Sequence, residues 1–163
     1  MTHPVSPLAP AESPRLPAVA GVRLAARECN IRYKNRTDVM LMEFAPGTTI
    51  AGVLTRSLTR SAPVDLCRKH LKSGKARAIL VNSGNANAFT GKAGIASVER
   101  CTKAVVAALK CKPSEVYLAS TGVIGEPLPE EQPQQPGQPP ATAGQPQQQP
   151  EQQPAQPEQP AAQ

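Results

Sequence analysis

The residues best suited to chemistry are Ser120, Thr121 and Gly122, which follow a short, mostly apolar segment. A threonine hydroxyl and a glycine backbone N–H placed just after a strand can both point at one spot, which suits a developing oxyanion. Glycine favours this use because no Cβ blocks a close substrate and because unusual backbone angles are accessible to it. The alternative interpretation is an ordinary turn at the end of a strand.

Other catalytic patterns fail on spacing. Gly84 and Gly91-Lys92 do not form a phosphate loop, because the glycines are too far apart and Ala93 stands where Ser or Thr must reach magnesium. The chain has no Gly-x-Ser-x-Gly elbow. His70 falls on an expected helix beside basic residues, so we expect a surface histidine and not a catalytic base. Motif chemistry alone therefore gives no complete catalytic set.

The four cysteines, Cys29, Cys67, Cys101 and Cys111, have no CxxC spacing, and a zinc site would need closer ligand pairs. Free thiols in a reducing compartment are the expected state. No apolar run is long enough for a membrane helix, and the N-terminus lacks the basic-then-apolar layout of a signal peptide. We therefore expect a cytoplasmic protein that has no membrane partner.

The elements that would position Thr121 and Gly122 are predicted from periodicity and from turn residues. Strands are expected over 22–28, 38–45 and 49–55, the last two forming a hairpin across Pro46-Gly47. A helix should begin near Ser61-Ala62-Pro63, with Asp65 in its first turn, and end at Gly74. A strand over 77–82, a helix over 94–110 and a strand over 115–119 complete the series. The apolar stripe of that second helix comprises Ile95, Val98, Thr102, Val105, Ala108 and Leu109.

The last three elements predict a strand–helix–strand unit with parallel strands and a right-handed crossover. Binding sites in such sheets lie beyond the carboxyl ends of the strands. The loops 82–87 and 120–122 both lie at those ends, so two loops of small and polar residues should meet at one sheet edge.

Composition divides the chain into an extended proline-rich lead-in over 1–18, an α/β domain over 19–128 and a tail over 129–163. The 35 residues of the tail are 10 Pro, 13 Gln, 5 Ala, 4 Glu, 2 Gly and 1 Thr. Such a segment cannot bury enough apolar surface to fold, so we expect disorder. It is either a PxxP-type ligand or spacer, or an unselected product of a frame change or fusion.

Residues 1–128 carry all 18 Lys and Arg against 8 of the 12 Asp and Glu, which gives 18 − 8 = +10. A charge of this size can attract nucleic acid or anionic metabolites. The bases are scattered, and with only two Tyr and two Phe there is no platform for stacking bases. A solvated basic surface is the better interpretation, and a nucleic-acid partner is not expected.

Several strings together resemble the ornithine acetyltransferase family, the bifunctional glutamate N-acetyltransferases of arginine biosynthesis. The most specific strings are Val81-Asn82-Ser83-Gly84-Asn85-Ala86-Asn87-Ala88-Phe89-Thr90-Gly91 and Ser120-Thr121-Gly122-Val123-Ile124-Gly125; Gly21–Ala26, Arg36–Val39 and Gly52–Thr55 add to them. The resemblance runs in order over about residues 17–128.

The resemblance implies an enzyme that cuts its own chain and uses the new N-terminal Thr to carry acetyl from N-acetylornithine to glutamate. It implies no cofactor, although some members use acetyl-CoA as a co-substrate. It also implies that Thr121 and Gly122 form the oxyanion hole. No role follows for Asn82, Asn85 or Asn87, which are expected to line or brace the same edge.

The sequence departs from the family near Pro127-Leu128, after which the self-cleavage segment and its nucleophilic Thr do not appear. We therefore expect the N-terminal part of the ornithine acetyltransferase fold, and a truncated chain that is inactive alone. A complementary C-terminal fragment is a possible partner. The alternative is a non-catalytic module that pairs with an intact homologue, or that binds a proline-recognising partner through its tail.

Overall fold

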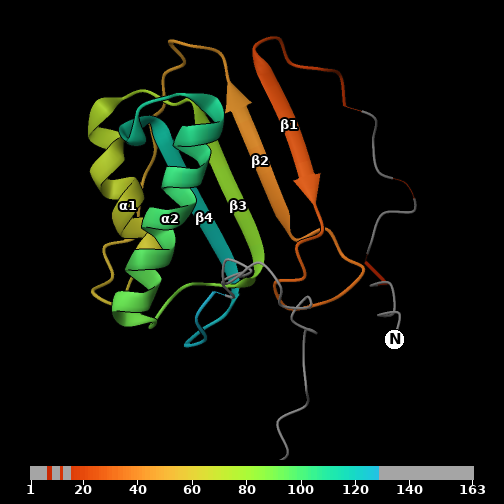
Figure 1. The fold of residues 1–163 in the computed structure, drawn as a ribbon, viewed down its shortest axis with the longest axis vertical. Helices are drawn as coiled ribbons and strands as arrows, with labels where there is room; N and C mark the ends of the chain where they lie inside the picture. The colour runs from red at the N-terminus through yellow and green to blue at the C-terminus, as the bar shows by residue number, and fades with distance from the viewer. Residues whose placement is uncertain (1–6, 9–11, 13–15, 129–163) are drawn as a thin grey trace, which may run out of the picture. The chain divides into compact units, whose positions relative to one another are not determined.

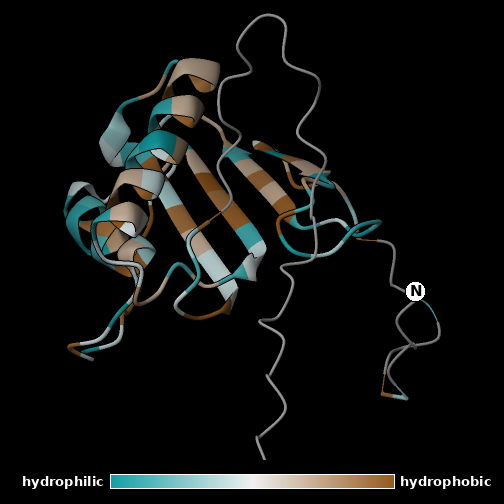
Figure 2. Ribbon diagram, turned by 60° about the horizontal axis from the view of Figure 1, so that its bottom comes forward, coloured by the Kyte–Doolittle hydropathy of each residue, from teal (hydrophilic) through white to brown (hydrophobic). Residues whose placement is uncertain are grey.

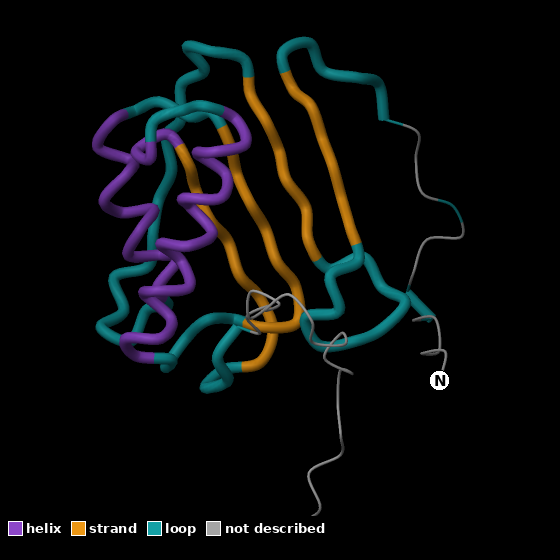
Figure 3. Tube along the Cα trace, viewed as in Figure 1, coloured by secondary structure: helices purple, strands orange, loops and turns teal. Residues whose placement is uncertain are grey.

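The computed structural model describes residues 7, 8, 12 and 16–128 of the chain; the predictions for the tail and for most of the lead-in lie outside these residues. Four strands form one sheet in the order β1-β2-β3-β4 (Figure 1). They are β1 (Val22–Arg27), β2 (Val39–Phe44), β3 (Ala78–Asn85) and β4 (Val116–Val123), and the helices are α1 (Ala62–His70) and α2 (Gly91–Leu109). Short 3-10 turns, Leu71–Ser73 and Pro113–Glu115, follow the two helices (Figure 3). The predicted α/β class is confirmed.

The predicted strand–helix–strand unit is present as β3, α2 and β4. β3 and β4 pair in parallel, with Ala78 opposite Val116 and Asn82 opposite Ser120. β2 pairs antiparallel with both β1 and β3. The carboxyl ends of β1, β3 and β4 therefore meet at one end of the sheet, the lower end in Figure 1.

The predicted strand over 49–55 is wrong, and so is its hairpin with β2. Within this segment only Thr49 makes a bridge, to Lys75. Because both edges of β2 are already paired, no edge is left for a strand that returns across the Pro46-Gly47 turn. The chain instead leaves the sheet, held by hydrogen bonds from Ala76 N to Thr48 O and from Ile50 N to Gly74 O.

The core lies between α2 and the sheet. Val98 and Val105 of α2 pack against Ala78, Val116 and Leu118, and all five are buried. Thr102 is also buried and satisfies its hydroxyl on Val98 O, one turn back. The predicted stripe is wrong at Ile95, which is 56% exposed, and at Ala108, which is exposed as well. Leu109, its last member, packs against the core as predicted.

The helix α1 lies along the outer edge of β4. Cys67 Sγ donates to Leu118 O at 3.2 Å, and His70 Nδ1 donates to Val116 O at 2.8 Å. The side chains of α1 thus satisfy carbonyls that an edge strand would otherwise leave open. The prediction of a surface histidine is wrong, because this contact buries His70 to 7% exposure.

The boundaries of α1 agree with the predicted signals. Ser61 has extended backbone angles, Pro63 lies in the first turn, and Asp65 forms an ion pair with Arg60. The 3-10 turn continues the helix to Gly74, which ends it in the left-handed conformation at φ 62°.

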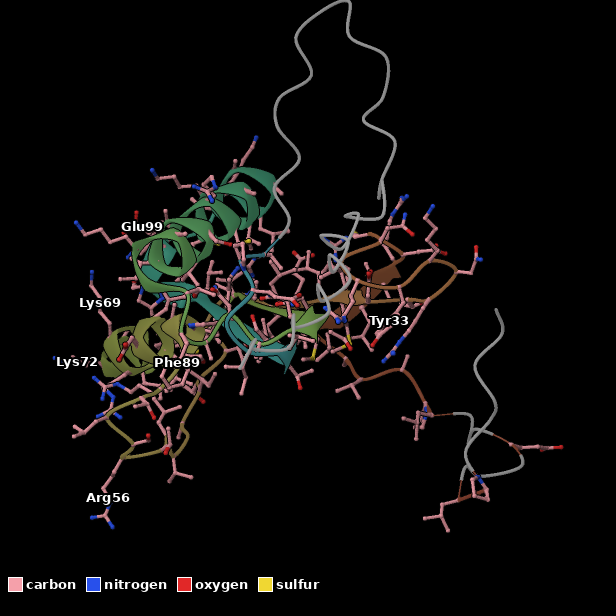
Figure 4. The ribbon with its side chains drawn as sticks, turned by 90° about the horizontal axis from the view of Figure 1, so that it is seen from below. Tyr33, Arg56, Lys69, Lys72, Phe89 and Glu99 are labelled. Carbon is pink, nitrogen blue, oxygen red and sulfur yellow. The ribbon has the colours of Figure 1, made fainter. Side chains whose placement is uncertain are left out.

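The helix α2 covers one face of the sheet, and α1 lies along the β4 edge (Figure 4). Because side chains alternate along a strand, those next to the core residues face the other way. They include Leu24, Met40, Met42, Ile79 and Val81. Within the described part of the chain no helix lies over this second face along β1 to β3, whereas Tyr117 of β4 contacts His70 of α1; apolar segments of the strands are visible in Figure 2. None of the described helices is long and apolar enough to cross a membrane.

Candidate functional site

The strand β4 continues through Ser120, Thr121 and Gly122 and ends at Val123. The predicted position of these residues just after a strand is therefore wrong by four residues. β3 extends to Asn85, and the two strands stay paired through Thr121 opposite Ser83 and Gly122 opposite Gly84. The register of the two strands shifts at Asn85. Thr121 and Gly122 therefore lie where the parallel pairing of β3 and β4 becomes irregular.

Gly122 has no room for a side chain. Its φ is +135°, and a Cβ there would lie 2.3 Å from Gly84 C and 2.5 Å from Asn85 N. A backbone atom cannot move aside as the tip of a side chain can, so the approach of the two strands requires glycine. Thr121 beside it is exposed, and its side chain makes no hydrogen bond within the part of the chain that the structure describes.

The asparagines of the 82–87 loop are structural braces. Asn82 receives the Ser120 hydroxyl on its Oδ1 at 2.5 Å and donates to Asn85 O at 2.9 Å. Asn85 accepts from Asn87 N and donates to Glu126 O at 2.7 Å. Asn85 and Asn87 are only 3% and 2% exposed. In each of these amides both the oxygen and the nitrogen have a hydrogen-bond partner, which fixes the local conformation, so these residues hold the ends of β3 and β4 together.

The same network sets the start of α2. Asn87 Nδ2 donates to Gly94 O at 3.1 Å, and Thr90 Oγ1 donates to Asn87 Oδ1 at 2.7 Å. A Cβ on Gly94 would lie 1.9 Å from Thr90 Oγ1, so this position of the helix is closed to larger residues. The helix begins at Gly91, three residues before the predicted start.

The loop between β1 and β2, residues 28–38, lies at this same end of the sheet (Figure 1). Its conformation depends on Asp38, whose carboxylate accepts from Cys29 N at 2.6 Å and Ile31 N at 2.7 Å. Asp38 is 6% exposed. At the other side of the loop, Glu28 accepts from Asn35 N. Each acidic side chain of the loop is therefore occupied by backbone N–H groups.

Gly84 is where this loop meets the sheet. A Cβ at Gly84 would lie 3.1 Å from Arg32 Cβ and 3.5 Å from Ile31 Cγ2, and its φ is +110°. The contact places the loop over the ends of β3 and β4. Together they enclose an open hollow of about 240 Å³ lined by Arg32, Tyr33, Arg36, Ser83, Gly84, Thr121, Gly122 and Val123.

The charge of this hollow is positive. Among the residues that the structure describes, the charged ones that line it are Arg32 and Arg36. Arg32 forms an ion pair with Glu126 at 2.6 Å. A hydrogen bond with Tyr33, followed by the charge of Glu126, raises the pKa of the Arg32 guanidinium above its ordinary value. Arg36 Nη2 donates to Ser83 Oγ at 3.3 Å.

The sequence singled out Thr121 and Gly122 as candidates but not Arg32, Tyr33 and Arg36, which line the same hollow. The available signal was a basic cluster around one aromatic residue in the loop Ile31-Arg32-Tyr33-Lys34-Asn35-Arg36. That string shows no periodicity, and its distance of more than 80 residues from Thr121 along the chain hides the contact. His70 does not line the hollow.

The four cysteines lie apart from this hollow, and none is in a disulfide. Cys29 is exposed, whereas the other three are partly buried. Burial raises the pKa of Cys67 and Cys101 above the ordinary thiol value. At neutral pH these two groups therefore stay protonated, and the thiol reacts more slowly than the thiolate.

Comparison with known proteins gives the family. The ArgJ family model matches residues 23–147, which reaches beyond the predicted limit of the resemblance near residue 128. The arginine biosynthesis bifunctional protein ArgJ of Bradyrhizobium diazoefficiens is 59% identical over 128 residues, and that of Gluconobacter oxydans is 56% identical. These alignments cover 78% of this chain but 31% and 30% of the relatives.

Two solved structures share the fold. Ornithine acetyltransferase from Mycobacterium tuberculosis, solved in complex with ornithine, matches with a TM-score of 0.65 and 39% identity over 68% of this chain and 60% of that chain. The ArgJ protein from Bacillus halodurans matches with a TM-score of 0.62 and 30% identity, over 68% and 58%. The chain thus spans about a third of the length of the curated relatives it matches. The resemblance read from its Asn-rich loop and its Ser-Thr-Gly string is confirmed, and the chain belongs to the ArgJ family.

Proposed function

We propose that this chain supplies the oxyanion-binding part of an acetyltransferase of arginine biosynthesis, which moves acetyl from N-acetylornithine to glutamate. The curated relatives carry the name of an arginine biosynthesis protein, and one structural relative is an ornithine acetyltransferase that holds ornithine. Thr121 and Gly122 would stabilise the negative charge that develops on the acetyl oxygen during transfer.

This proposal rests mainly on the exposure and the hydrogen bonding of the Thr121 hydroxyl. Its exposed hydroxyl has no hydrogen-bond partner within the described residues, while the neighbouring Ser120 and Asn82 are bonded to each other. A donor held on a rigid strand without a partner is available to a ligand, and such preorganised donors stabilise a developing charge strongly. Gly122 lets the substrate approach the strand closely because no Cβ is there.

We further propose that the 163 residues do not complete the reaction by themselves. The family resemblance assigns the nucleophilic role to a Thr in a self-cleavage segment, and no such segment is present in the sequence. Loss of a nucleophile removes the acyl-enzyme route and not merely part of its rate. A separate polypeptide that begins with that Thr would be the partner, and acetyl-CoA is a further candidate donor.

The uncovered sheet face favours such a partner. Leu24 is 67% exposed, and Met40, Met42, Ile79 and Val81 beside it are only partly buried. Contiguous apolar surface of this kind marks an interaction site more often than a solvated surface. A polypeptide with an apolar surface of its own could pack against this face and form a second layer.

The test is an acetyl-transfer assay, from N-acetylornithine to glutamate, on the purified chain with and without a separately expressed fragment that begins at the family's Thr. We expect activity only on mixing. Thr121→Ala should then lower kcat about 100-fold or more, since loss of one oxyanion donor costs roughly 10²–10³ in kcat. Activity of the chain alone would contradict the claim that a nucleophile is lacking; inactivity of the mixture would contradict the proposed catalytic role.

A further inference from the structure

The hollow beside Thr121 contains groups that an oxyanion hole does not require. We propose that Arg36, Tyr33 and Ser83 form a subsite for the carboxylate of an N-acylated α-amino acid, whose acyl oxygen lies at Thr121 and Gly122. This inference rests on the proposed function. It adds the position at which the negatively charged carboxylate of the substrate binds.

The spacing of the groups fits one ligand. Arg36 Nη2 lies 3.3 Å from Ser83 Oγ, and Ser83 is the register partner of Thr121 on the adjacent strand. Neighbouring strands are about 4.8 Å apart, so the guanidinium is within roughly 8 Å of Thr121. In an N-acylated α-amino acid only the nitrogen and the α-carbon separate the acyl carbonyl from the carboxylate. A single small molecule can therefore reach both positions.

The charges of the hollow leave Arg36 as the anion-binding group. Glu126 forms an ion pair with Arg32, whereas Arg36 forms none within the described residues. The two acids of the loop are occupied: Asp38 accepts from Cys29 N and Ile31 N, and Glu28 accepts from Asn35 N. No carboxylate of residues 16–128 lines the hollow.

The guanidinium of Arg36 is held in place before any ligand arrives. Its Cζ lies 5.7 Å from the centroid of the Tyr33 ring, and Arg32 Cζ lies 5.8 Å from the same ring. Cation–π contact and the bond to Ser83 restrain a side chain that is otherwise long and mobile. Tyr33 is at the right of Figure 4, at the end of the sheet that is seen from below. Prior ordering lowers the entropic cost of binding.

A carboxylate fits this set better than a phosphate does. A planar guanidinium matches the two oxygens of a carboxylate with two parallel hydrogen bonds. The neighbouring positive charge of Arg32 is already balanced by Glu126. One unbalanced cation and one hydroxyl suit a single negative charge, whereas a doubly charged phosphate would be left partly uncompensated.

The experiment is an NMR titration of the full 163-residue chain that follows the backbone amides of Ser83, Gly84 and Gly122. The probes are N-acetylornithine, its carboxamide, which lacks the negative charge, and inorganic phosphate. We expect the amide signals to shift with N-acetylornithine and to shift little with the carboxamide. Acetyl transfer is not needed for this readout, so failure of the proposed catalysis and failure of the carboxylate subsite are separate results.

Two variants make the assignment specific. Arg36→Gln should weaken binding of N-acetylornithine about tenfold, because hydrogen bonds to charged groups contribute that much. Lys34→Gln is the matched control: it removes the same charge from the same loop, but Lys34 does not line the hollow, and binding should be about unchanged. Arg36→Lys keeps the charge without the planar fork and should bind with intermediate strength.

The inference is overturned if the carboxamide shifts these signals as strongly as the carboxylate does. It is also overturned if Arg36→Gln and Lys34→Gln weaken binding equally, which would indicate a diffuse effect of net charge. A third contrary result is phosphate binding that is tighter than the binding of N-acetylornithine and that disappears in Arg36→Gln. That result would assign the hollow to a different anion. The spread of the amide signals in each variant establishes that it remains folded.

Discussion

At the scale of single residues, the site depends on a series of close approaches between backbones. Gly122 lies against Gly84 C, and Gly84 in turn lies against the Cβ of Arg32. Two glycines with positive φ therefore bring the end of β4 and the loop 28–38 together. A side chain at either position would separate the strands or lift the loop off the sheet.

Gly122→Ala should be strongly destabilising for this reason. A Cβ that meets backbone atoms at 2.3 Å, at a φ of +135°, adds steric overlap to conformational strain. We expect a loss of at least about 2 kcal/mol in the free energy of unfolding. Chemical denaturation followed by circular dichroism measures this loss. Thr121→Ala, at an exposed neighbouring position, should change stability by less than about 0.5 kcal/mol; equal losses in the two variants would contradict this account.

The cysteines should differ in their reactivity with iodoacetamide. Burial raises the pKa of Cys67 and Cys101, so at a given pH less of each is thiolate, the reactive form. At pH 8 we expect mass spectrometry to find Cys29, which is exposed, labelled first. Labelling of Cys67 should continue to rise with pH above the ordinary thiol range. In denaturant the differences should disappear; if they persisted, burial would not be their cause.

At the scale of elements, α1 protects the open edge of β4. A parallel sheet needs cover at its edge, because the outward carbonyls of the last strand are a template for unwanted pairing. Cys67 and His70 donate to Leu118 O and Val116 O, so the helix closes this edge by side-chain hydrogen bonds. The packing of α1 and the parallel ladder are therefore coupled.

His70→Phe tests that coupling. The variant keeps an aromatic ring beside Tyr117 but leaves Val116 O without its donor. A buried group without a partner costs about 1–3 kcal/mol, and thermal unfolding should report a lower Tm. Lys69→Ala, one residue away and exposed, is the control and should unfold like the parent chain. A His70→Phe variant as stable as the parent would show that the edge does not need this bond.

At the scale of the whole molecule, the described residues form a sheet with α2 on one face and α1 along the β4 edge. The other face carries Leu24, Met40, Met42, Ile79 and Val81. The fragment proposed above as a partner would cover this face with a second apolar layer.

Leu24→Lys should weaken assembly with that fragment. Leu24 is 67% exposed, so a lysine there is tolerated in the chain alone but would be buried in the assembly. Ala25→Lys places the same charge on the same strand, on the opposite face. Analytical ultracentrifugation of each variant mixed with the fragment should show a loss of complex for Leu24→Lys of about tenfold or more and little change for Ala25→Lys. Equal effects would place the interface elsewhere.

The sequence alone determined the local elements and the family. The β3–α2–β4 unit was predictable because a period of three to four residues and Pro113 after the helix are local signals. The start and end of α1 at Ser61 and Gly74 follow from capping, which also depends on adjacent residues. Thr121 and Gly122 were recognisable because their string is specific to the family; their assigned role stays a prediction.

The tertiary structure decided what depends on distant neighbours. The segment 49–55 is apolar enough for a strand but finds both edges of β2 occupied. His70 looks like a surface residue among its basic neighbours, yet the edge of β4 buries it. Arg36 reaches Ser83 only because Asp38 folds the loop and Gly84 admits it. Local patterns fix what a segment can form, whereas pairing partners and burial are set by residues far away along the chain, which no local pattern records.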